Sequence, residues 1–194
     1  MASKYIAIEG MDGSGKTTQA KMLTEFLKKQ GFSVLSVTEP SKSALGKMIS
    51  EKLIKKKYSP EAVALAFSCD RMIHFDEIIR PASEKYDYII TDRSYISSMA
   101  YQPLQGLRFE WVRELNRYVM KPDLIFLLDI PAVVFMQRRG KTKVIFENHE
   151  FQKKLRQAYL ALPKRLNEDF IVVDGIKGID EIHEKIRSDV MRLP

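Results

Sequence analysis

A short stretch near the start of the chain has the residue types and spacing needed to hold a chain of phosphates. Residues Gly10 to Thr17, GMDGSGKT, match the pattern G-x-x-x-x-G-K-[S/T]. Because Gly13 and Gly15 lack side chains, the loop can turn its backbone N–H groups inward around phosphate oxygens, and the positive end of a following helix adds to this attraction. Lys16 can then reach the β- and γ-phosphates, and the Thr17 hydroxyl can bind Mg²⁺. The stretch therefore predicts binding of ATP with Mg²⁺.

Asp12 is the unexpected member of this stretch, because a carboxylate repels anionic phosphates unless it points away from them. We expect it to face a second substrate, where it accepts a hydrogen bond from a sugar hydroxyl or lies near the counter-charges of the attacking phosphate. A plain surface position is the alternative.

Short apolar runs alternate with longer amphipathic stretches along the whole chain. Runs of Ile, Val and Leu predict buried strands at 4–9, 33–38, 88–91, 124–130 and 170–174. Apolar residues three or four positions apart predict helices at 16–30, 60–80, 109–120, 147–162 and 179–190. Nearly continuous apolar strands between helices are typical of a parallel sheet covered on both faces. The predicted fold is α/β, a three-layer α/β/α arrangement with a five-stranded parallel sheet of the P-loop NTPase type.

Parallel sheets of this kind bind ligands beyond the carboxyl ends of their strands. Glu9, Glu39, Asp92 and Asp129 end or follow the predicted strands and are candidates for that rim. No internal repeat, low-complexity segment or Gly/Ser linker divides the sequence. We therefore expect residues 1–194 to form a single domain.

The composition argues against several other kinds of protein. The 194 residues include one cysteine, which excludes an internal disulfide framework and fits a reducing compartment. The three histidines are far apart and form no zinc pattern. The formal charge of +7 suits an anionic partner, but the nucleic-acid-binding signatures are missing, so a nucleic-acid partner is disfavoured. No apolar segment is long enough for a membrane span or a secretory signal, and we expect a cytoplasmic protein.

Further motifs follow the phosphate-binding stretch in a distinctive order. The guanine-reading pattern N/T-K-x-D is absent, because TKVI at 142–145 lacks the aspartate, and a GTPase is therefore disfavoured. The motifs are FSCDR at 67–71, TDRSYISSMAYQ at 91–102, PDLIFLLD at 122–129 and RRGKTKVIFEN at 138–148. This series resembles the thymidylate kinase family from Ile6 to about Arg187. The resemblance implies a cytosolic enzyme, commonly a homodimer, that transfers the γ-phosphoryl group of ATP to dTMP, giving dTDP and ADP in dTTP synthesis.

The resemblance assigns an acceptor site to the middle of the chain. Phe67 matches an aromatic that stacks on thymine and Arg71 an arginine that contacts the base, and their spacing of four puts them on one helical face. Asp92 would organise Mg²⁺ and its waters, and the planar guanidinium of Arg93 would hold the acceptor phosphate. Core packing for Phe67 and a structural ion pair for the Asp–Arg pair are the alternatives. The implied substrate-binding residues are Asp12, Glu39, Pro40, Lys42, Phe67, Arg71, Arg93, Ser97, Tyr101 and Gln102.

Residues 138–146 match a lid that closes over ATP, in which Arg138 and Arg139 would bring positive charge to the transferred phosphoryl group or stack on adenine. A solvated basic loop is the alternative. The implied catalytic residues are Lys16, Arg93, Asp12, Asp92, Arg138 and Arg139, and the implied metal ligands are Thr17 and Asp92. The ATP-binding residues are Gly10, Met11, Asp12, Gly13, Ser14, Gly15, Lys16, Thr17, Thr18 and Arg139.

The chain also departs from the family pattern. Lys42 is the nearest cation where relatives often place an arginine on the monophosphate, and Ile145 stands where a lid arginine is typical. Two other functions stay open on the sequence alone. One is a nucleoside or nucleotide kinase of broader specificity, and the other is a regulatory P-loop protein that binds nucleotide without transferring phosphate. The aromatic and arginine of the acceptor site argue against the second.

Overall fold

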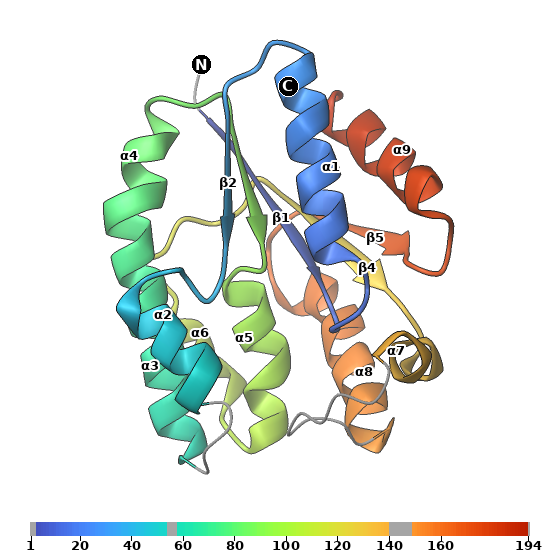
Figure 1. The fold of residues 1–194 in the computed structure, drawn as a ribbon. Coiled ribbons are helices and arrows are strands. Elements are labelled where there is room, and N and C mark those ends of the chain that lie inside the picture. Colours follow the sequence, from blue (N-terminus) through green and yellow to red (C-terminus); the bar gives the residue numbers. More distant parts are fainter. Residues whose placement is uncertain (1–2, 54–57, 140–148, 194) are drawn as a thin grey trace.

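The computed structural model describes residues 3–53, 58–139 and 149–193, and it shows a parallel sheet between two layers of helices (Figure 1). The strands of the described part lie in the order β2-β3-β1-β4-β5, and all neighbours are parallel. Their bounds are Lys4–Gly10 (β1), Val34–Thr38 (β2), Tyr88–Asp92 (β3), Leu124–Asp129 (β4) and Phe170–Asp174 (β5). The predicted α/β fold with a five-stranded parallel sheet is confirmed.

Helices cover the sheet on both faces, which explains the continuous apolar runs of its strands. On one face, α1 (Lys16–Lys29) and α9 (Ile179–Val190) lie side by side and pack against Ile6 and Ile8 (Figure 1). On the other face, Ala7 and Ile125 pack in a core with α5 (Tyr95–Tyr101), α6 (Phe109–Leu115), α7 (Ala132–Arg139) and α8 (His149–Arg165). Successive residues of β1 therefore face different helical layers, and both must be apolar.

Two helical segments differ from the predicted ranges. The stretch predicted at 60–80 forms α3 (Pro60–His74), a π-helical turn at Phe75–Ile79 and α4 (Arg80–Ser83). The helix predicted at 109–120 ends at Leu115, because the side chain of Asn116 turns back to accept and donate hydrogen bonds inside the protein. The start of the helix predicted at 147–162 lies outside the described residues.

Several short helical segments were not predicted. They are α2 (Ala44–Met48) with a π-helical turn at Ile49–Leu53, α5, a 3₁₀ turn at Pro103–Gln105, and α7. Most side chains of α5 are buried, so this helix shows no alternation of polar and apolar faces in its sequence. None of the helices in the described ranges is long and apolar enough to cross a membrane.

The sheet order brings three loops together at one edge. β1 lies between β3 and β4, with Ile8 beside Asp92 and Gly10 beside Leu128. Because all the strands run the same way, the loops that follow β1, β2 and β3 leave the same edge of the sheet, near α2 and α5 (Figure 1). The predicted phosphate-binding stretch and the predicted acceptor residues therefore meet where parallel sheets bind ligands.

Candidate functional site

The segment Gly10–Thr18, here called the donor loop, connects β1 to α1 and has the geometry of an anion-binding turn. Gly13 and Gly15 have φ of 70° and 99°, in the left-handed region that side chains disfavour. Gly10 is needed for another reason, since a Cβ there would lie 2.5 Å from the carbonyl oxygen of Leu128. The first turn of α1 carries no acidic residue, so its N-terminal N–H groups remain favourable to an anion. The buried members of the loop include Met11 and Ser14.

Lys16, the first residue of α1, folds back over the donor loop. It is buried, and its Nζ donates a 2.7 Å hydrogen bond to the carbonyl oxygen of Met11. Burial lowers the pKa of Lys16 to about 8, and the charge of Arg93 acts in the same direction. The carboxylates of Asp12 and Asp92 oppose this shift only in part. A phosphate bound in the loop would therefore stabilise the charged form of the amine.

Asp12 points out of the donor loop toward an arginine that follows a neighbouring strand. Its Oδ1 accepts a hydrogen bond from Arg93 Nη2, forming an ion pair. The side chain of Asp12 is 61% exposed and that of Arg93 is 19% exposed, so the pair lies on the open side of the site. The pair joins the donor loop, after β1, to the predicted acceptor side, after β3.

Arg93 has a left-handed backbone, with φ of 74°, which is uncommon for a residue other than glycine. Its N–H donates a 3.1 Å hydrogen bond to the Ile8 carbonyl, and its own carbonyl accepts a 2.5 Å bond from Thr91 Oγ1. In the side chain, Nη1 donates a 3.0 Å bond to Ser97 Oγ, and the guanidinium carbon lies 5.8 Å from the centre of the Tyr101 ring. Backbones of this kind persist where their surroundings fix them, and they cluster at functional sites.

Thr17 and Asp92, the two predicted metal ligands, lie side by side. The Thr17 hydroxyl donates a 2.5 Å hydrogen bond to Asp92 Oδ2, while Asp92 Oδ1 is buried and has no hydrogen-bond partner among the described residues. Across those residues no group of three His, Cys, Asp or Glu side chains gathers as for a metal held by protein alone. Mg²⁺ is commonly held by one or two carboxylates together with waters and substrate phosphates, so this hydroxyl and carboxylate fit the ion. Thr18 is exposed on the same turn of α1.

Arg71, on α3, lies at the centre of a buried polar group on the acceptor side. Its Nε donates a 2.5 Å hydrogen bond to Glu39, its Nη1 donates to Asn116, and its Nη2 donates a 3.1 Å bond to Ser98 Oγ. Gln102 Nε2 reaches the same Ser98 hydroxyl at 3.4 Å. Burial raises the pKa of Glu39, and the charge of Arg71 opposes that shift. These five residues, here called the Arg71 cluster, bring α3 and α5 together with the segments that directly follow β2 and α6, around one guanidinium.

The loop that follows β2 is tied to the same helix. Asp70, the residue before Arg71, accepts hydrogen bonds from Ser41 N at 2.7 Å, Ser41 Oγ at 2.5 Å and Ser43 Oγ at 2.9 Å. The Ser43 hydroxyl also caps the N-terminus of α2. Two consecutive residues of α3 therefore hold both ends of the segment 39–43. Within it, Pro40 is half-buried and Lys42 is exposed.

The remaining predicted acceptor residues lie on α3 and α5. Phe67 is half-buried on α3, one turn before Arg71. Tyr101, at the end of α5, is half-buried and contacts α8, with ring centres 6.4 Å from Phe151 and 6.2 Å from Tyr159. Ser97, one turn before it, accepts the hydrogen bond from Arg93.

Arg138 approaches the donor loop from α7. Its Nη1 donates a 3.2 Å hydrogen bond to the carbonyl of Gly13, and its Nη2 donates a 3.0 Å bond to the carbonyl of Gly175, which follows β5. The guanidinium therefore lies beside the predicted phosphate position. Arg139 is the last residue of α7, but its side chain and residues 140–146 of the predicted lid lie outside the described part of the chain.

Known proteins share this sequence pattern over almost its full length. The family model described as thymidylate kinase matches residues 8–186. The chain belongs to the thymidylate kinase family. A probable thymidylate kinase of Pyrococcus abyssi is 38% identical over 195 residues, which cover 96% of this chain and 95% of that protein. Probable thymidylate kinases of Thermococcus onnurineus and Methanocaldococcus jannaschii are 39% and 38% identical, over 94% and 98% of this chain and 94% and 97% of their own lengths.

Membership of the thymidylate kinase family confirms the predicted activity, an enzyme that phosphorylates dTMP. The roles of individual residues are a separate question. The geometry adds residues to the site that the sequence did not single out. Asp70 and Ser98 stand beside predicted residues in the motifs FSCDR and SYISSMAYQ, so proximity in sequence was a usable signal. Asn116 belongs to no motif, and its contact with Arg71 becomes visible only in the fold.

Two of the rim residues expected at the strand ends have structural partners. Asp129 forms a bidentate ion pair with Arg156 of α8, with distances of 2.7 and 2.8 Å. Glu9 is fully buried and binds residues of the segment after β3. Burial raises the pKa of Glu9, and the charge of Arg93 opposes that shift.

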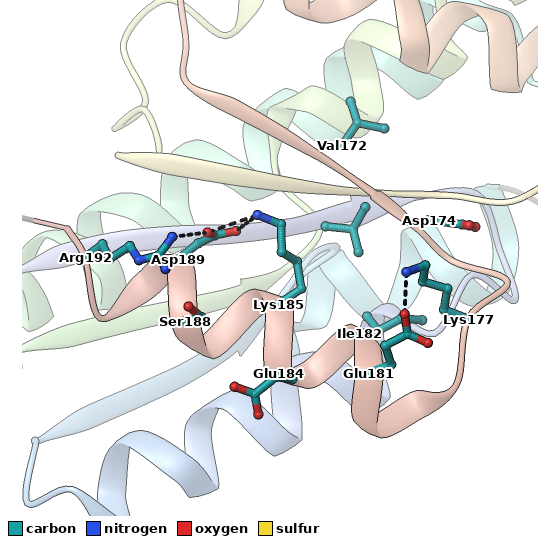
Figure 2. A pocket seen from close by; sticks show the side chains of 11 residues that line it. Val172, Asp174, Lys177, Glu181, Ile182, Glu184, Lys185, Ser188, Asp189 and Arg192 are labelled. Carbon is teal, nitrogen blue, oxygen red and sulfur yellow. Dashed lines mark hydrogen bonds and ion pairs between the residues drawn. The ribbon is translucent and has the colours of Figure 1, made fainter.

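A hollow of about 560 Å³ lies between β5 and α9 (Figure 2). Figure 2 shows that several of its charged side chains turn toward one another, Lys177 toward Glu181, and Lys185 and Arg192 toward Asp189. None of the predicted site residues described by the structure lines it. The candidate active site of this thymidylate kinase family member is therefore placed by the loops after β1, β2 and β3 and not by this hollow.

Proposed function

We propose that phosphoryl transfer from ATP to dTMP takes place between the donor loop and the Arg71 cluster, with residues 1–194 acting as one P-loop kinase domain. The ion pair between Asp12 and Arg93 supports this most directly, because it joins the donor side to the acceptor side. Transfer of a phosphoryl group depends on placement and charge neutralisation more than on a strong base. No covalent intermediate with the protein is needed.

On the donor side, the N–H groups of the donor loop hold the phosphates of ATP. Lys16 exchanges its hydrogen bond to the Met11 carbonyl for one to the β- and γ-phosphates, and this contact restores its full charge. Arg138, already beside Gly13, adds positive charge at the transferred group, and we assign Arg139 a supporting role on ATP. Thr17 and Asp92 would hold Mg²⁺, which supplies charge neutralisation and alignment of the phosphates when it is bound.

On the acceptor side, Arg93 holds the phosphate of dTMP and Asp12 accepts a hydrogen bond from the sugar. Phe67 stacks on the base. The described contacts engage three of the N–H groups of Arg71, and we assign the others to the edge of the base. The other residues proposed to line this pocket are Glu39, Pro40, Lys42, Ser97, Tyr101 and Gln102.

A coupled assay of ADP formation across nucleoside monophosphates tests the acceptor assignment. We expect turnover that depends on both dTMP and Mg²⁺, with dUMP used less well and AMP not at all. Similar rates with dUMP, UMP and dTMP would instead identify a kinase of broader specificity. Turnover with UMP or AMP but not dTMP would defeat the assignment of this pocket.

The metal assignment has its own test. Replacing Asp92 by asparagine removes the carboxylate charge, and we expect the Mg²⁺ concentration at half-maximal rate to rise by about tenfold. Asp129→Asn provides a matched control, because Asp129 also ends a strand at this edge but is occupied by Arg156. An unchanged Mg²⁺ requirement in Asp92→Asn would contradict the metal role.

We also propose a cytoplasmic location, because the single cysteine fits a reducing compartment.

A homodimer formed through α3 is a further part of the proposal. Leu65, Cys69 and Ile73 repeat every four residues along α3 and are all exposed, with Leu65 at 51% and Ile73 at 39%. An exposed apolar stripe of this kind suits a second copy of the same helix. The sedimentation coefficient at micromolar concentration should be that of a dimer, and Leu65→Glu should give a monomer. A monomeric wild-type protein would contradict the proposal.

A further inference from the structure

Glu9 is a fully buried carboxylate at the carboxyl end of β1, directly before the donor loop. Its Oε1 accepts hydrogen bonds from Ser94 N at 2.6 Å and Ser94 Oγ at 2.9 Å. Its Oε2 accepts a 2.8 Å bond from Ser97 Oγ and a 3.4 Å bond from the Tyr159 hydroxyl. A buried carboxylate is costly unless it is hydrogen-bonded, so this arrangement is a specific one. Both oxygens are directed at the segment that follows β3.

Two of the residues that Glu9 contacts are linked directly to Arg93. Ser94 is the next residue in the chain, and Ser97 Oγ accepts a 3.0 Å hydrogen bond from Arg93 Nη1. A serine hydroxyl has a single hydrogen, and Ser97 donates it to Glu9. Glu9 is the acceptor in each of its described hydrogen bonds, so it fixes the direction of this hydroxyl and turns a lone pair of the Ser97 oxygen toward the guanidinium.

The backbone of the same turn is also fixed by β1. Arg93 adopts φ of 74°, its N–H binds the carbonyl of Ile8, and the following N–H, that of Ser94, binds the side chain of Glu9. Two consecutive residues of β1 therefore hold two consecutive N–H groups of the turn. The left-handed conformation of Arg93 and the direction of its guanidinium have a common origin at the end of β1.

We propose that Glu9 is a positioning residue for the acceptor phosphate, acting on the Arg93 backbone through Ser94 and on the Arg93 guanidinium through Ser97. The inference rests on the role proposed above for Arg93. Because Gly10 follows Glu9 directly and opens the donor loop, the same strand end sets where the phosphates of both substrates meet.

The test replaces Glu9 by glutamine, which has nearly the same size. Its amide oxygen can still accept from Ser94, but its NH₂ group then donates to Ser97, so the Ser97 hydrogen must turn in another direction and the lone pair offered to Arg93 is no longer fixed. We expect kcat/KM for dTMP to fall by about 100-fold, since a displacement near 1 Å of a reacting group has an effect of this size. The KM for ATP should stay within about twofold of the wild-type value.

Asp87→Asn is the matched control. Asp87 also accepts hydrogen bonds from the N–H and the hydroxyl of one serine, Ser33, both at 2.7 Å, but it precedes β3 and so lies at the opposite end of the sheet. Its dTMP kinetics should match those of the wild type. Ser97→Ala removes only the link to the guanidinium, and we expect a fall of about tenfold in kcat/KM for dTMP. This variant carries the test if Glu9→Gln does not fold.

Arg93→Ala separates the inference from the proposal beneath it. If Glu9 acts through Arg93, Glu9→Gln should cause no further loss in the Arg93→Ala background. An equal loss in both backgrounds, or an equal rise in the KM values for ATP and dTMP, would overturn the inference. An unchanged KM for dTMP in Arg93→Ala contradicts the role of Arg93 itself. A raised KM in that variant, together with wild-type kinetics in Glu9→Gln, contradicts only the role of Glu9.

Discussion

The donor loop and the Arg71 cluster both bury a positive charge, but they hold it in different ways. In the donor loop, Lys16 binds a neutral carbonyl only five residues away, and its pKa falls to about 8. In the Arg71 cluster, the guanidinium pairs with the buried carboxylate of Glu39, which lies 32 residues away in the sequence. The Lys16 charge has no closely paired carboxylate and is available to a bound phosphate. The Arg71 charge already has an ion-pair partner in the protein, and this pair is part of the packed interior.

This difference predicts opposite relations between activity and stability in the two regions. Removing a desolvated charge that lacks a strong partner does not weaken the fold. Removing one partner of a buried ion pair leaves the other uncompensated, which is strongly destabilising. Mutations in the two regions can therefore test whether the two charges have these different roles.

The largest expected effect is the loss of turnover in Lys16→Ala. Because the charge acts on the transferred phosphoryl group, we expect kcat to fall by about 10³-fold, with no decrease in the free energy of unfolding of the ligand-free protein. ADP formation with dTMP and a thermal unfolding curve measure the two quantities. Lys21→Ala is the matched control on the same helix, where Lys21 forms an exposed pair with Glu25. A large drop in the stability of Lys16→Ala would contradict the claim that the Lys16 charge does not stabilise the fold.

The next effect is expected in Arg71→Ala, which leaves Glu39 buried without its partner. We expect a loss of about 3–5 kcal/mol in the free energy of unfolding, together with a raised KM for dTMP. The second change Glu39→Gln should restore part of the stability but not the KM. Arg80→Ala removes an exposed pair between the start of α4 and Asp76 of the preceding π-helical turn, and it should cost less than about 1 kcal/mol. Equal stability of the Arg71 and Arg80 variants in chemical denaturation would show that the cluster is not structural.

The smallest effect concerns the pH dependence of ATP binding. The pKa of Lys16 is lowered to about 8 from 10.5, so the ligand-free protein loses this proton as the pH rises through 8, whereas bound phosphate favours the charged amine. The affinity for ATP should therefore fall above pH 8, by at most about tenfold per pH unit, and binding should take up a proton. Calorimetry in buffers of different ionisation enthalpy measures that uptake.

The same shift has a consequence for the ligand-free protein. Between pH 8 and 10.5 the unfolded chain binds more protons at this residue than the folded one, so the contribution of Lys16 makes stability rise with pH in that window. Lys16→Ala should lack this contribution. A wild-type profile identical to that of the variant, with no proton uptake on binding ATP, would contradict the lowered pKa.

The comparison also explains how much of the site the sequence predicted. The position of the donor loop between a strand and a helix was predicted correctly, because its glycines, its lysine and its hydroxyl lie close together in one short stretch of sequence. Both ends of each strand were placed within one residue, because the apolar runs are local signals. The family resemblance supplied Phe67, Arg71 and the Asp92–Arg93 pair.

The rest could not be predicted because its contacts join residues far apart in the chain. Glu9 meets Ser94 across 85 residues, and Arg71 meets Asn116 across 45. The early end of α6 is linked to the second of these contacts. The Asn116 side chain accepts a hydrogen bond from Arg71 and donates one to the carbonyl of Val112, and the helix does not continue past this residue. The buried helix α5 lacked the amphipathic pattern that identifies a surface helix.

Because Glu9 and Gly10 are neighbours, the residues that set the geometry of phosphoryl transfer are separate from those assigned to the base. The geometry of bond making is anchored at one strand end, whereas the contacts assigned to the base come from α3, with support from α5 and α6. Substitutions on those helices can change which nucleotide is admitted and leave the transfer axis intact. An insertion of one residue at the end of β1, by contrast, would misalign donor and acceptor for every substrate alike.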